Sequence, residues 1–583
     1  MKRIFGPLLA ALALLLSFGG HKDPFPKDVF RSPLDVPLTL AGNFAEMRSN
    51  HFHAGLDLKT GNRIGLPVHA AADGWVSRIK VSPTGYGLAL YVDHPEGYTT
   101  VYGHLSRFAD SLGAYVKRLQ YRERSFAIDT YPPRGRFPVK QGEVIAFSGN
   151  TGSSGGPHLH FEIRDAATEE PLNPLLFGLP VKDTRPPKIF RLKVYAAKDG
   201  SFARIERQSG PPILVRPGAP ATLRVTRENG AYRLRDVRRI QAHGRIGFGI
   251  QTHDYHDGSN NRLGVFRIRL DADDETLFRS EVDRFSFAQT RYINAHVDYA
   301  EHERSRRWVQ RSFLLPGNRL PFYRTENRGF LNVSEGMRRR LTYTVEDAAG
   351  NRARLAFEVE GTAARPVSVG DASGYAAVIP RARPAVFRRE GLRVSFPAYA
   401  LYEDLELRYQ TLPPKEGAFS PLHAVHDAFT PVHKSLTLDL RADALPKALR
   451  RRALIARVDP KGNVSSEGGA FRNGFLETRV RSFGTFFVTV DTLAPDIRPL
   501  NIRPGKSMRG LSSIRLRIKD DLAGIASYVG YIDGEWTLFA YDAKTGTLVH
   551  TFDGRIAAGP HTLSMIVTDR VGNVARYEAA FTR

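Results

Sequence analysis

A strict two-residue alternation in residues 158–164 restricts this part of the chain to an extended strand. Apolar side chains occupy every second position, at Leu159, Phe161 and Ile163. Polar side chains occupy the positions between them, at His158, His160, Glu162 and Arg164. Because successive side chains of a strand point to opposite faces, the pattern predicts one face packed in a core and both histidines on the other.

A second alternating segment, residues 51–58, adds further candidate metal ligands. Its apolar face holds Phe52, Ala54, Leu56 and Leu58, and its other face holds His51, His53, Gly55 and Asp57. Gly55 has no side chain, so another part of the chain can approach the backbone closely there. Imidazole nitrogen and carboxylate oxygen are good zinc ligands, and three of them leave a fourth position for water. Either segment alone is also compatible with the solvent face of an amphipathic strand.

A third element, residues 102–105 (Tyr-Gly-His-Leu), ends a strand-like run. With it, the sequence resembles the lysostaphin-type (LytM-like) zinc metalloendopeptidases, which cut peptide bonds in bacterial peptidoglycan. The histidine and aspartate that this family spaces four apart are matched by His53 and Asp57, and its closing element is matched by residues 151–162. Shorter landmarks of the family lie between these elements, at residues 65–70, 73–76 and 140–146.

The resemblance covers roughly residues 40–178 and implies an antiparallel β-sheet peptidase domain with assigned residue roles. It implies three zinc ligands, His53, Asp57 and His160. It also implies two catalytic residues beside the metal, His104 and His158. One of these two would take a proton from water, and either could stabilise the oxyanion or protonate the leaving amine. The sequence does not divide these roles between the two histidines.

Other polar side chains near these motifs have alternative interpretations. His51 shares a predicted strand face with His53 and is a rival ligand, but the four-residue spacing favours His53 and leaves His51 at the rim. Glu162 is either a partner that orients a ligand or a solvated strand residue. For His69 and His94 we expect positions on the surface of a strand or loop.

The stretch between His104 and residue 142 is longer and more basic than a plain connection. We predict an inserted, solvated loop at residues 110–137, since loops of this length often serve as lids or binding segments. Because it lies between two elements of the candidate site, contact with substrate is the second interpretation.

A length of 583 residues exceeds what one hydrophobic core supports, so several domains are expected. After residue 180 the sequence changes to alternating strands punctuated by turns. Similar joint sequences at residues 183–189 and 491–497, and Asp-x-x-Gly-Asn turns beginning at Asp347, Asp459 and Asp569, indicate tandem immunoglobulin-like β-sandwiches. The predicted all-β organisation is a peptidase domain at 28–182 and modules at 183–361, 362–490 and 491–583.

One segment of the first module, residues 254–261, is rich in Asp, Asn, Ser and Gly and contains His256. A turn-rich loop is the expected structure, and calcium binding is an alternative. The modules show no second catalytic constellation in their sequence, so we expect them to space, bind or regulate rather than to catalyse.

Residues 1–20 match a secretory signal peptide, with two basic residues, an apolar run and two glycines. The chain has no cysteine, which excludes disulfides and a lipid-modified cysteine at the cleavage site. After cleavage we expect no membrane span. The net charge of +24 either favours anionic envelope polymers as partners or is simply a basic surface. Nucleic acid is not an expected partner, because no binding motif for it is present.

Together these features predict an exported zinc metalloendopeptidase that acts on peptidoglycan stem peptides or cross-links, in the periplasm or at the cell surface. Two alternatives are a catalytically inactive regulator of another wall hydrolase and a surface binding or adhesion protein. Loss of a ligand would indicate the first, but His53, Asp57 and His160 are all present. Cell-surface binding that persists in a His160→Ala variant would favour the second.

Overall fold

The computed structural model describes residues 25–198, 200–364, 374–459 and 461–583. Strands dominate these ranges, which confirms the all-β prediction. The expected signal peptide at residues 1–20 lies outside the described residues. Within the described ranges, every helix is too short or too polar to cross a membrane.

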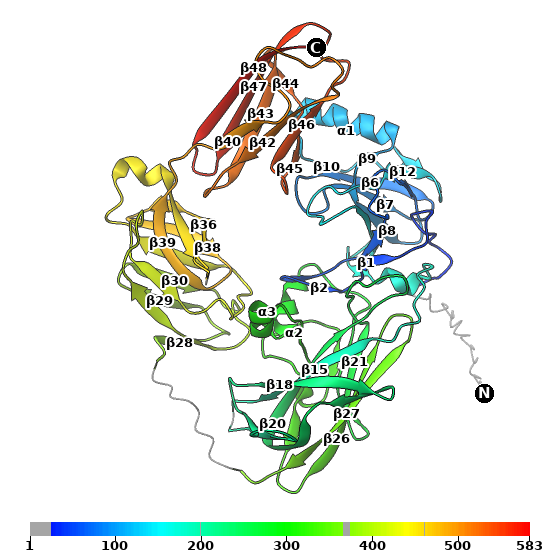
Figure 1. The fold of residues 1–583 in the computed structure, drawn as a ribbon, viewed down its shortest axis with the longest axis vertical. Coiled ribbons are helices and arrows are strands. Elements are labelled where there is room, and N and C mark those ends of the chain that lie inside the picture. Colours follow the sequence, from blue (N-terminus) through cyan, green and yellow to red (C-terminus); the bar gives the residue numbers. More distant parts are fainter. Residues whose placement is uncertain (1–24, 199, 365–373, 460) are drawn as a thin grey trace, which may run out of the picture.

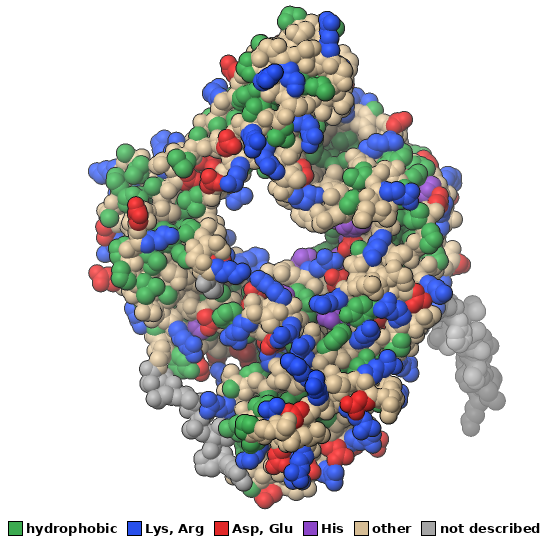
Figure 2. Space-filling view, viewed as in Figure 1, with side chains coloured by type: hydrophobic (Ala, Val, Ile, Leu, Met, Phe, Trp, Pro, Cys, Tyr) green, Lys and Arg blue, Asp and Glu red, His purple; other side chains and the backbone are tan. Residues whose placement is uncertain are grey.

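Four hydrophobic cores follow one another along the chain and form four bodies around a central opening (Figures 1 and 2). Their buried residues fall mainly within residues 30–179, 189–359, 379–488 and 502–581. Because each core is separate, we propose that they mark a peptidase domain and three β modules. The proposed bounds are 28–182, 183–361, 362–490 and 491–583.

An antiparallel nine-stranded sheet forms the centre of the first body, with the main order β1-β4-β13-β8-β7-β6-β10. Its strands are β1 (Leu40–Gly42), β4 (Leu56–Lys59), β13 (His158–Asp165), β8 (Tyr98–Leu105), β7 (Leu88–Asp93), β6 (Gly74–Val81), β10 (Ile128–Thr130), β11 (Pro138–Val139) and β14 (Pro171–Leu172). A separate hairpin of β2 (Met47–Arg48) and β3 (His51–Phe52) precedes β4. The central strands β4, β13 and β8 therefore bring together the three motifs singled out in the sequence.

Residues 110–137 do not form the predicted loop. Helix α1 (Asp110–Glu123) occupies the first half, and β10 then pairs with β6 at the sheet edge. Leu112, Val116 and Leu119 have helical spacing and are buried against the peptidase core. The loop prediction was wrong because the basic residues between these three obscure their helical spacing in the sequence.

The first module packs directly on the hairpin that leads to the candidate site. Its large sheet includes β15 (Lys188–Ala196), β20 (Val237–His253) and β26 (Arg338–Glu346), and short helices α2 (Ile293–His296) and α3 (Tyr299–Ser305) lie beside it. Phe44, Met47 and Phe52 of the peptidase domain share a buried cluster with module residues that include Phe285 and Ile293. The module therefore fixes the segment that carries His53.

The last module returns to the peptidase domain and closes the ring (Figure 1). Its strands β42 (Ser513–Lys519), β47 (Pro560–Asp569) and β48 (Val574–Thr582) belong to two small sheets. Lys117 Nζ of α1 lies 2.5 Å from Asp553 Oδ2. The Tyr121 and Trp536 rings meet edge to face with centroids 5.3 Å apart. A cavity of about 460 Å³ beside this contact is lined from both sides, including Thr151 and Leu538.

We expect Trp536→Ala to open the ring. An edge-to-face aromatic contact is worth about 0.5–1.5 kcal/mol beyond its buried area, so its loss should shift a closed–open equilibrium by up to roughly tenfold. Small-angle X-ray scattering should then report a larger radius of gyration. Leu511→Ala is the control, because Leu511 is 41% exposed on the same module. An unchanged radius in Trp536→Ala would show that other contacts hold the ring closed.

Candidate metal centre

Strand register brings Asp57 and His160 face to face. In the antiparallel pair β4–β13, Asp57 is the direct partner of His160, and on the other side His160 is the partner of Gly103 in β8. The predicted close approach at Gly55 is present, since a Cβ there would lie 2.2 Å from the carbonyl oxygen of Phe161. The polar face of β13 is not solvated, because His160 and Glu162 are 2% and 0% exposed.

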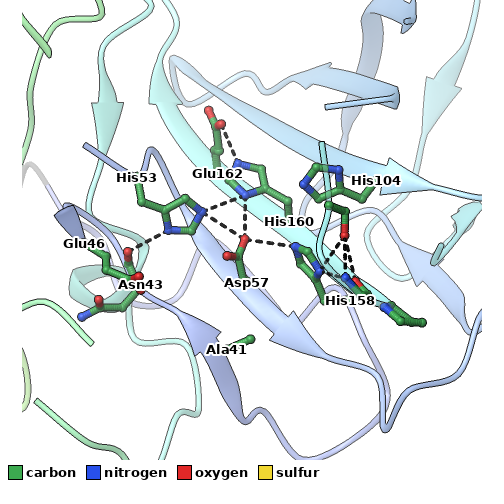
Figure 3. Close-up of polar contacts among 12 residues, drawn as sticks. Ala41, Asn43, Glu46, His53, Asp57, His104, His158, His160 and Glu162 are labelled. Carbon is green, nitrogen blue, oxygen red and sulfur yellow. Dashed lines mark hydrogen bonds and ion pairs between the residues drawn. The ribbon is translucent and has the colours of Figure 1, made fainter. Parts of the chain in front are cut away.

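Three side-chain atoms converge at one point of this face (Figure 3). His53 Nε2 and Asp57 Oδ1 are 3.0 Å apart, His160 Nδ1 and Asp57 Oδ1 are also 3.0 Å apart, and the two histidine nitrogens are 3.1 Å apart. Ligands at the vertices of a tetrahedral zinc site are about 3.3 Å apart, given metal–ligand bonds near 2.0 Å. These three residues are thus arranged as a group that could hold a metal ion.

The hydrogen bonds outside this triangle decide which nitrogen of each ring faces in. His53 Nδ1 donates to the carbonyl oxygen of Asn43 at 2.8 Å, and His160 Nε2 donates to Glu162 Oε1 at 2.7 Å. When both rings are neutral, as metal binding requires, the inward atoms His53 Nε2 and His160 Nδ1 therefore direct their lone pairs toward the Asp57 carboxylate. Three acceptors facing one another fit a cation at their centre.

The carboxylates around His160 favour positive charge there. Burial opposes ionisation of Asp57, but His53 and the hydrogen bonds from the histidines outweigh it and hold the pKa of Asp57 well below its usual range. Burial also opposes protonation of His160, yet hydrogen bonds to Asp57 and Glu162 raise its pKa to about 9. The same field that attracts a proton to this ring attracts a metal cation.

Glu162 is the outer partner that the sequence left open. Burial raises the pKa of its carboxyl, but the charge of Arg164 and the bond from His160 prevail, and its pKa falls to about 2. Its Oε2 accepts from Arg164 Nε at 2.7 Å. Glu162 is therefore ionised, and orients His160 rather than facing solvent.

His104 and His158 lie beside the triangle with the same bonding pattern. Each donates from Nδ1 to a backbone carbonyl at 2.8 Å, His104 to Thr151 and His158 to Gly156, which leaves Nε2 of both rings for other partners. The ring centroids are 4.8 Å apart, and His158 Nε2 lies 3.3 Å from Asp57 Oδ1. Both rings thus border the triangle of possible metal ligands.

The backbone and charge state of His104 are unusual. Its φ of 58° is left-handed, a conformation that costs a non-glycine residue about 1–3 kcal/mol and often marks a functional position. Burial and the neighbouring His160 and His158 lower the pKa of His104 to about 3. The ring is therefore neutral near pH 7 and can accept a proton or a hydrogen bond at Nε2.

Two supporting residues had no recognisable signal in the sequence. Asn43 holds His53 as described, and Arg48 Nη2 lies 3.1 Å from Asp57 Oδ2, the oxygen outside the triangle. Both precede the histidine motif, in and before the β2–β3 hairpin. Their positions depend on how that hairpin folds back, which local periodicity does not encode.

The remaining histidines do not join the centre. His51 is exposed and bonds to the Ser49 carbonyl. His69 and His94 are buried, contrary to the predicted surface positions, because their rings bond inside the fold. The ring of His94, for example, joins the Asp73 carbonyl to Thr100 Oγ1, at 2.8 Å each.

Comparison with known proteins identifies matches to two families. Residues 51–121 and 135–174 match Peptidase family M23, and residues 377–491 match a Zu5-like domain. The chain is 32% identical over 163 residues to the DD-carboxypeptidase/endopeptidase Mpg of Neisseria meningitidis serogroup B, covering 28% of this chain and 31% of that protein. It is 31% identical over 129 residues to the peptidoglycan DD-endopeptidase ShyB of Vibrio cholerae, covering 22% of this chain and 24% of that protein.

These alignments span only about a third or less of each curated relative's length. Among solved structures, the catalytic domain of lysostaphin from Staphylococcus simulans matches at 24% identity with a TM-score of 0.17. That match covers 23% of this chain and 87% of the lysostaphin chain.

Proposed function

From the Peptidase M23 domain that residues 51–121 and 135–174 form, we propose that this protein is an exported zinc metalloendopeptidase of peptidoglycan. The observation that carries the proposal is the buried triangle of His53 Nε2, Asp57 Oδ1 and His160 Nδ1, all lone-pair atoms. The proposed substrates are stem peptides or cross-links, in line with the names of the relatives it resembles. Because such substrates lie outside the cytoplasmic membrane, we place the protein in the periplasm or at the cell surface.

The residues fit zinc in ligand type as well as spacing. Two imidazoles and one carboxylate would hold it, and zinc, when bound, polarises a scissile carbonyl and lowers the pKa of water. Asn43 and Glu162 fix the ring tautomers, and Arg48 fixes the outer oxygen of Asp57. The basic charge of the chain would add attraction to anionic envelope polymers.

His104 and His158 supply the proton chemistry in this proposal. Their Nδ1 bonds to backbone carbonyls keep both rings oriented with Nε2 toward the reacting groups. The neutral state of His104 lets it accept a proton from water or a hydrogen bond from substrate. Either ring, once protonated, can stabilise the oxyanion or deliver the proton to the leaving amine.

Digestion of purified muropeptides tests the proposal. The full chain from residue 21 should cleave them with zinc, and chelation or Asp57→Ala should stop cleavage. The products identify which bond is cut. Full cleavage by the Asp57→Ala variant or by metal-free protein would contradict the mechanism.

Glu162→Gln should weaken zinc binding about 10–100-fold, the usual effect of losing a partner that orients a ligand. The amide lacks the charge that stabilises His160, and it leaves Arg164 without its buried partner. Competition with a chromophoric chelator measures the affinity. Glu169→Gln is a matched control, since Glu169 also contacts Arg164, at 3.2 Å, but its side chain is 58% exposed. Equal zinc affinity in Glu162→Gln and the parent would refute the orienting role.

A further inference from the structure

A second cluster of metal-binding side chains lies where the peptidase domain joins the first module. It consists of Asp183 in the linker, Asp254 and His256 directly after β20, and Asp347 directly after β26. His256 Nε2 lies 3.3 Å from Asp254 Oδ2 and 3.4 Å from Asp183 Oδ2. The three residues Asp183, Asp254 and His256 each offer a ligand atom within 4.8 Å of the others. We call these four residues the joint cluster.

Several carboxylate oxygens of the joint cluster are buried without a hydrogen bond, although one oxygen of Asp183 and one of Asp347 each accept a backbone N–H, from Arg185 and Asn351. Asp254 is 1% exposed, and neither of its oxygens makes a hydrogen bond with any described residue. One oxygen each of Asp183 and Asp347 is also buried without a hydrogen bond, and so is His256 Nδ1. Leaving a buried charge uncompensated costs several kcal/mol. Asp183 and Asp254 share the single imidazole of His256, and Asp347 adds a third carboxylate within electrostatic range, so a further cation would balance the site.

The nearby arginine does not supply that charge. Arg185 Nη1 donates to the backbone carbonyls of His256 and Ser259, at 2.9 and 2.7 Å. Its side chain ties the loop together, and its backbone N–H donates to Asp183 Oδ1 at 3.1 Å. The electrostatic balance is thus met neither by this guanidinium nor by the single histidine.

The last module provides an internal comparison. Asp491, Asp520 and Asp569 occupy the corresponding places: a linker, the turn after a strand, and the start of an Asp-x-x-Gly-Asn turn. In both modules the asparagine of that turn bonds the linker carbonyl, Asn351 to Asp183 at 3.2 Å and Asn573 to Asp491 at 2.9 Å.

The carboxylates of the last module are nevertheless satisfied. Asp491 accepts from Ala523 N at 2.9 Å, and Asp520 accepts from Gly524 N at 2.6 Å. Asp569 accepts from Asn573 Nδ2 at 2.6 Å. Of these two sets, only the joint cluster therefore has buried carboxylate oxygens without a hydrogen bond.

We propose that the joint cluster binds one divalent cation through the carboxylates of Asp183, Asp254 and Asp347, with His256 at its edge. Carboxylate oxygens select hard cations, so the expected ions are calcium and manganese. This site is separate from the zinc centre and does not depend on the proposed peptidase activity.

The cation would order the loop of residues 254–263, which leads to the partner of one proposed zinc ligand, His53. A pair of backbone bonds between Asp254 and Leu263 closes the loop, and Leu263 is buried in the peptidase core. Beyond it, Gly264 exchanges two 2.8 Å bonds with the side chain of Asn43. Because the Asn43 carbonyl accepts from His53 Nδ1, the joint cluster is linked to the first zinc ligand through one residue.

Cation binding is measured on the full chain carrying His160→Ala, which removes a ligand of the zinc centre. Isothermal titration with CaCl₂ and with MnCl₂ should find one site per chain for at least one ion. Asp254→Asn should abolish that site, and Asp520→Asn, its counterpart in the last module, should keep it. The proposal fails if neither ion binds, or if binding persists in Asp254→Asn.

Thermal unfolding is an independent test of cation binding at the joint cluster. A cation at a hundredfold excess over its Kd should raise the melting temperature of the first module in the parent by about 5–11 °C, and should leave Asp254→Asn unchanged. Without divalent cations, Asp254→Asn should be at least as stable as the parent, because it removes an uncompensated charge. An equal destabilisation by Asp254→Asn with and without the cation would overturn the proposal and identify an internal ion pair with His256 instead.

Discussion

His160→Ala should abolish the zinc binding and the peptidoglycan hydrolysis that we propose for this protein. His160 Nδ1 lies 3.0 and 3.1 Å from the other two donor atoms, so its loss removes one of three ligands and opens a gap in a buried site. It also removes the donor that His160 Nε2 supplies to Glu162 Oε1. Because the metal supplies several kcal/mol of transition-state stabilisation, the rate should fall by roughly 10³-fold or more.

Metal analysis after dialysis against a weak zinc buffer measures the zinc content of His160→Ala, and muropeptide digestion measures its rate of hydrolysis. His51→Ala is the matched control: it removes the exposed histidine from the neighbouring hairpin and should leave zinc content unchanged. Zinc retained in His160→Ala and lost in His51→Ala would reverse the ligand assignment.

His104→Ala and His158→Ala should each leave zinc bound but strongly reduce turnover. Neither histidine contributes an atom to the triangle of His53, Asp57 and His160, so zinc should remain bound. Loss of a positioned proton-transfer group, however, costs about 10²–10⁴-fold in rate. The reduction should appear in kcat rather than KM, because the groups act on the reacting atoms. Zinc analysis and steady-state kinetics on a soluble cross-linked muropeptide provide both readouts.

The two histidines can be separated in the same experiment. His158 Nε2 already lies 3.3 Å from the ligand carboxylate, so His158→Ala should perturb zinc affinity more than His104→Ala does. Activity that survives in either alanine variant would remove that residue from the mechanism. Loss of zinc from both would mean that the metal site extends beyond the three proposed ligands.

The strand periodicity in the sequence was sufficient to predict much of the local geometry. Alternation in residues 158–164 placed His158 and His160 on one side of β13, and Gly55 marked a close backbone approach. Such features depend on neighbours in the chain, because side-chain direction in a strand repeats every two residues. The all-β class followed from the same pattern.

Failures occurred where burial outweighed polarity. The basic residues of 110–137 indicated a solvated loop, yet three apolar residues at helical spacing anchor α1 to the core. His69 and His94 look like surface residues in the sequence but bond inside the fold. A polar side chain gives no local sign of whether a distant segment will satisfy it and cover it.

The sequence by itself determined the ligand types, the face each strand presents and the spacing within each motif. Only the tertiary structure decided that Asp57 and His160 stand opposite each other, that Asn43 and Glu162 select the inward nitrogens, and that Asp183 and Asp254 from separate segments meet at the joint cluster. The physical reason is the distance along the chain over which each interaction acts. Side-chain alternation is set within a few residues, whereas strand register, burial and charge balance depend on contacts between segments that can lie a hundred or more residues apart.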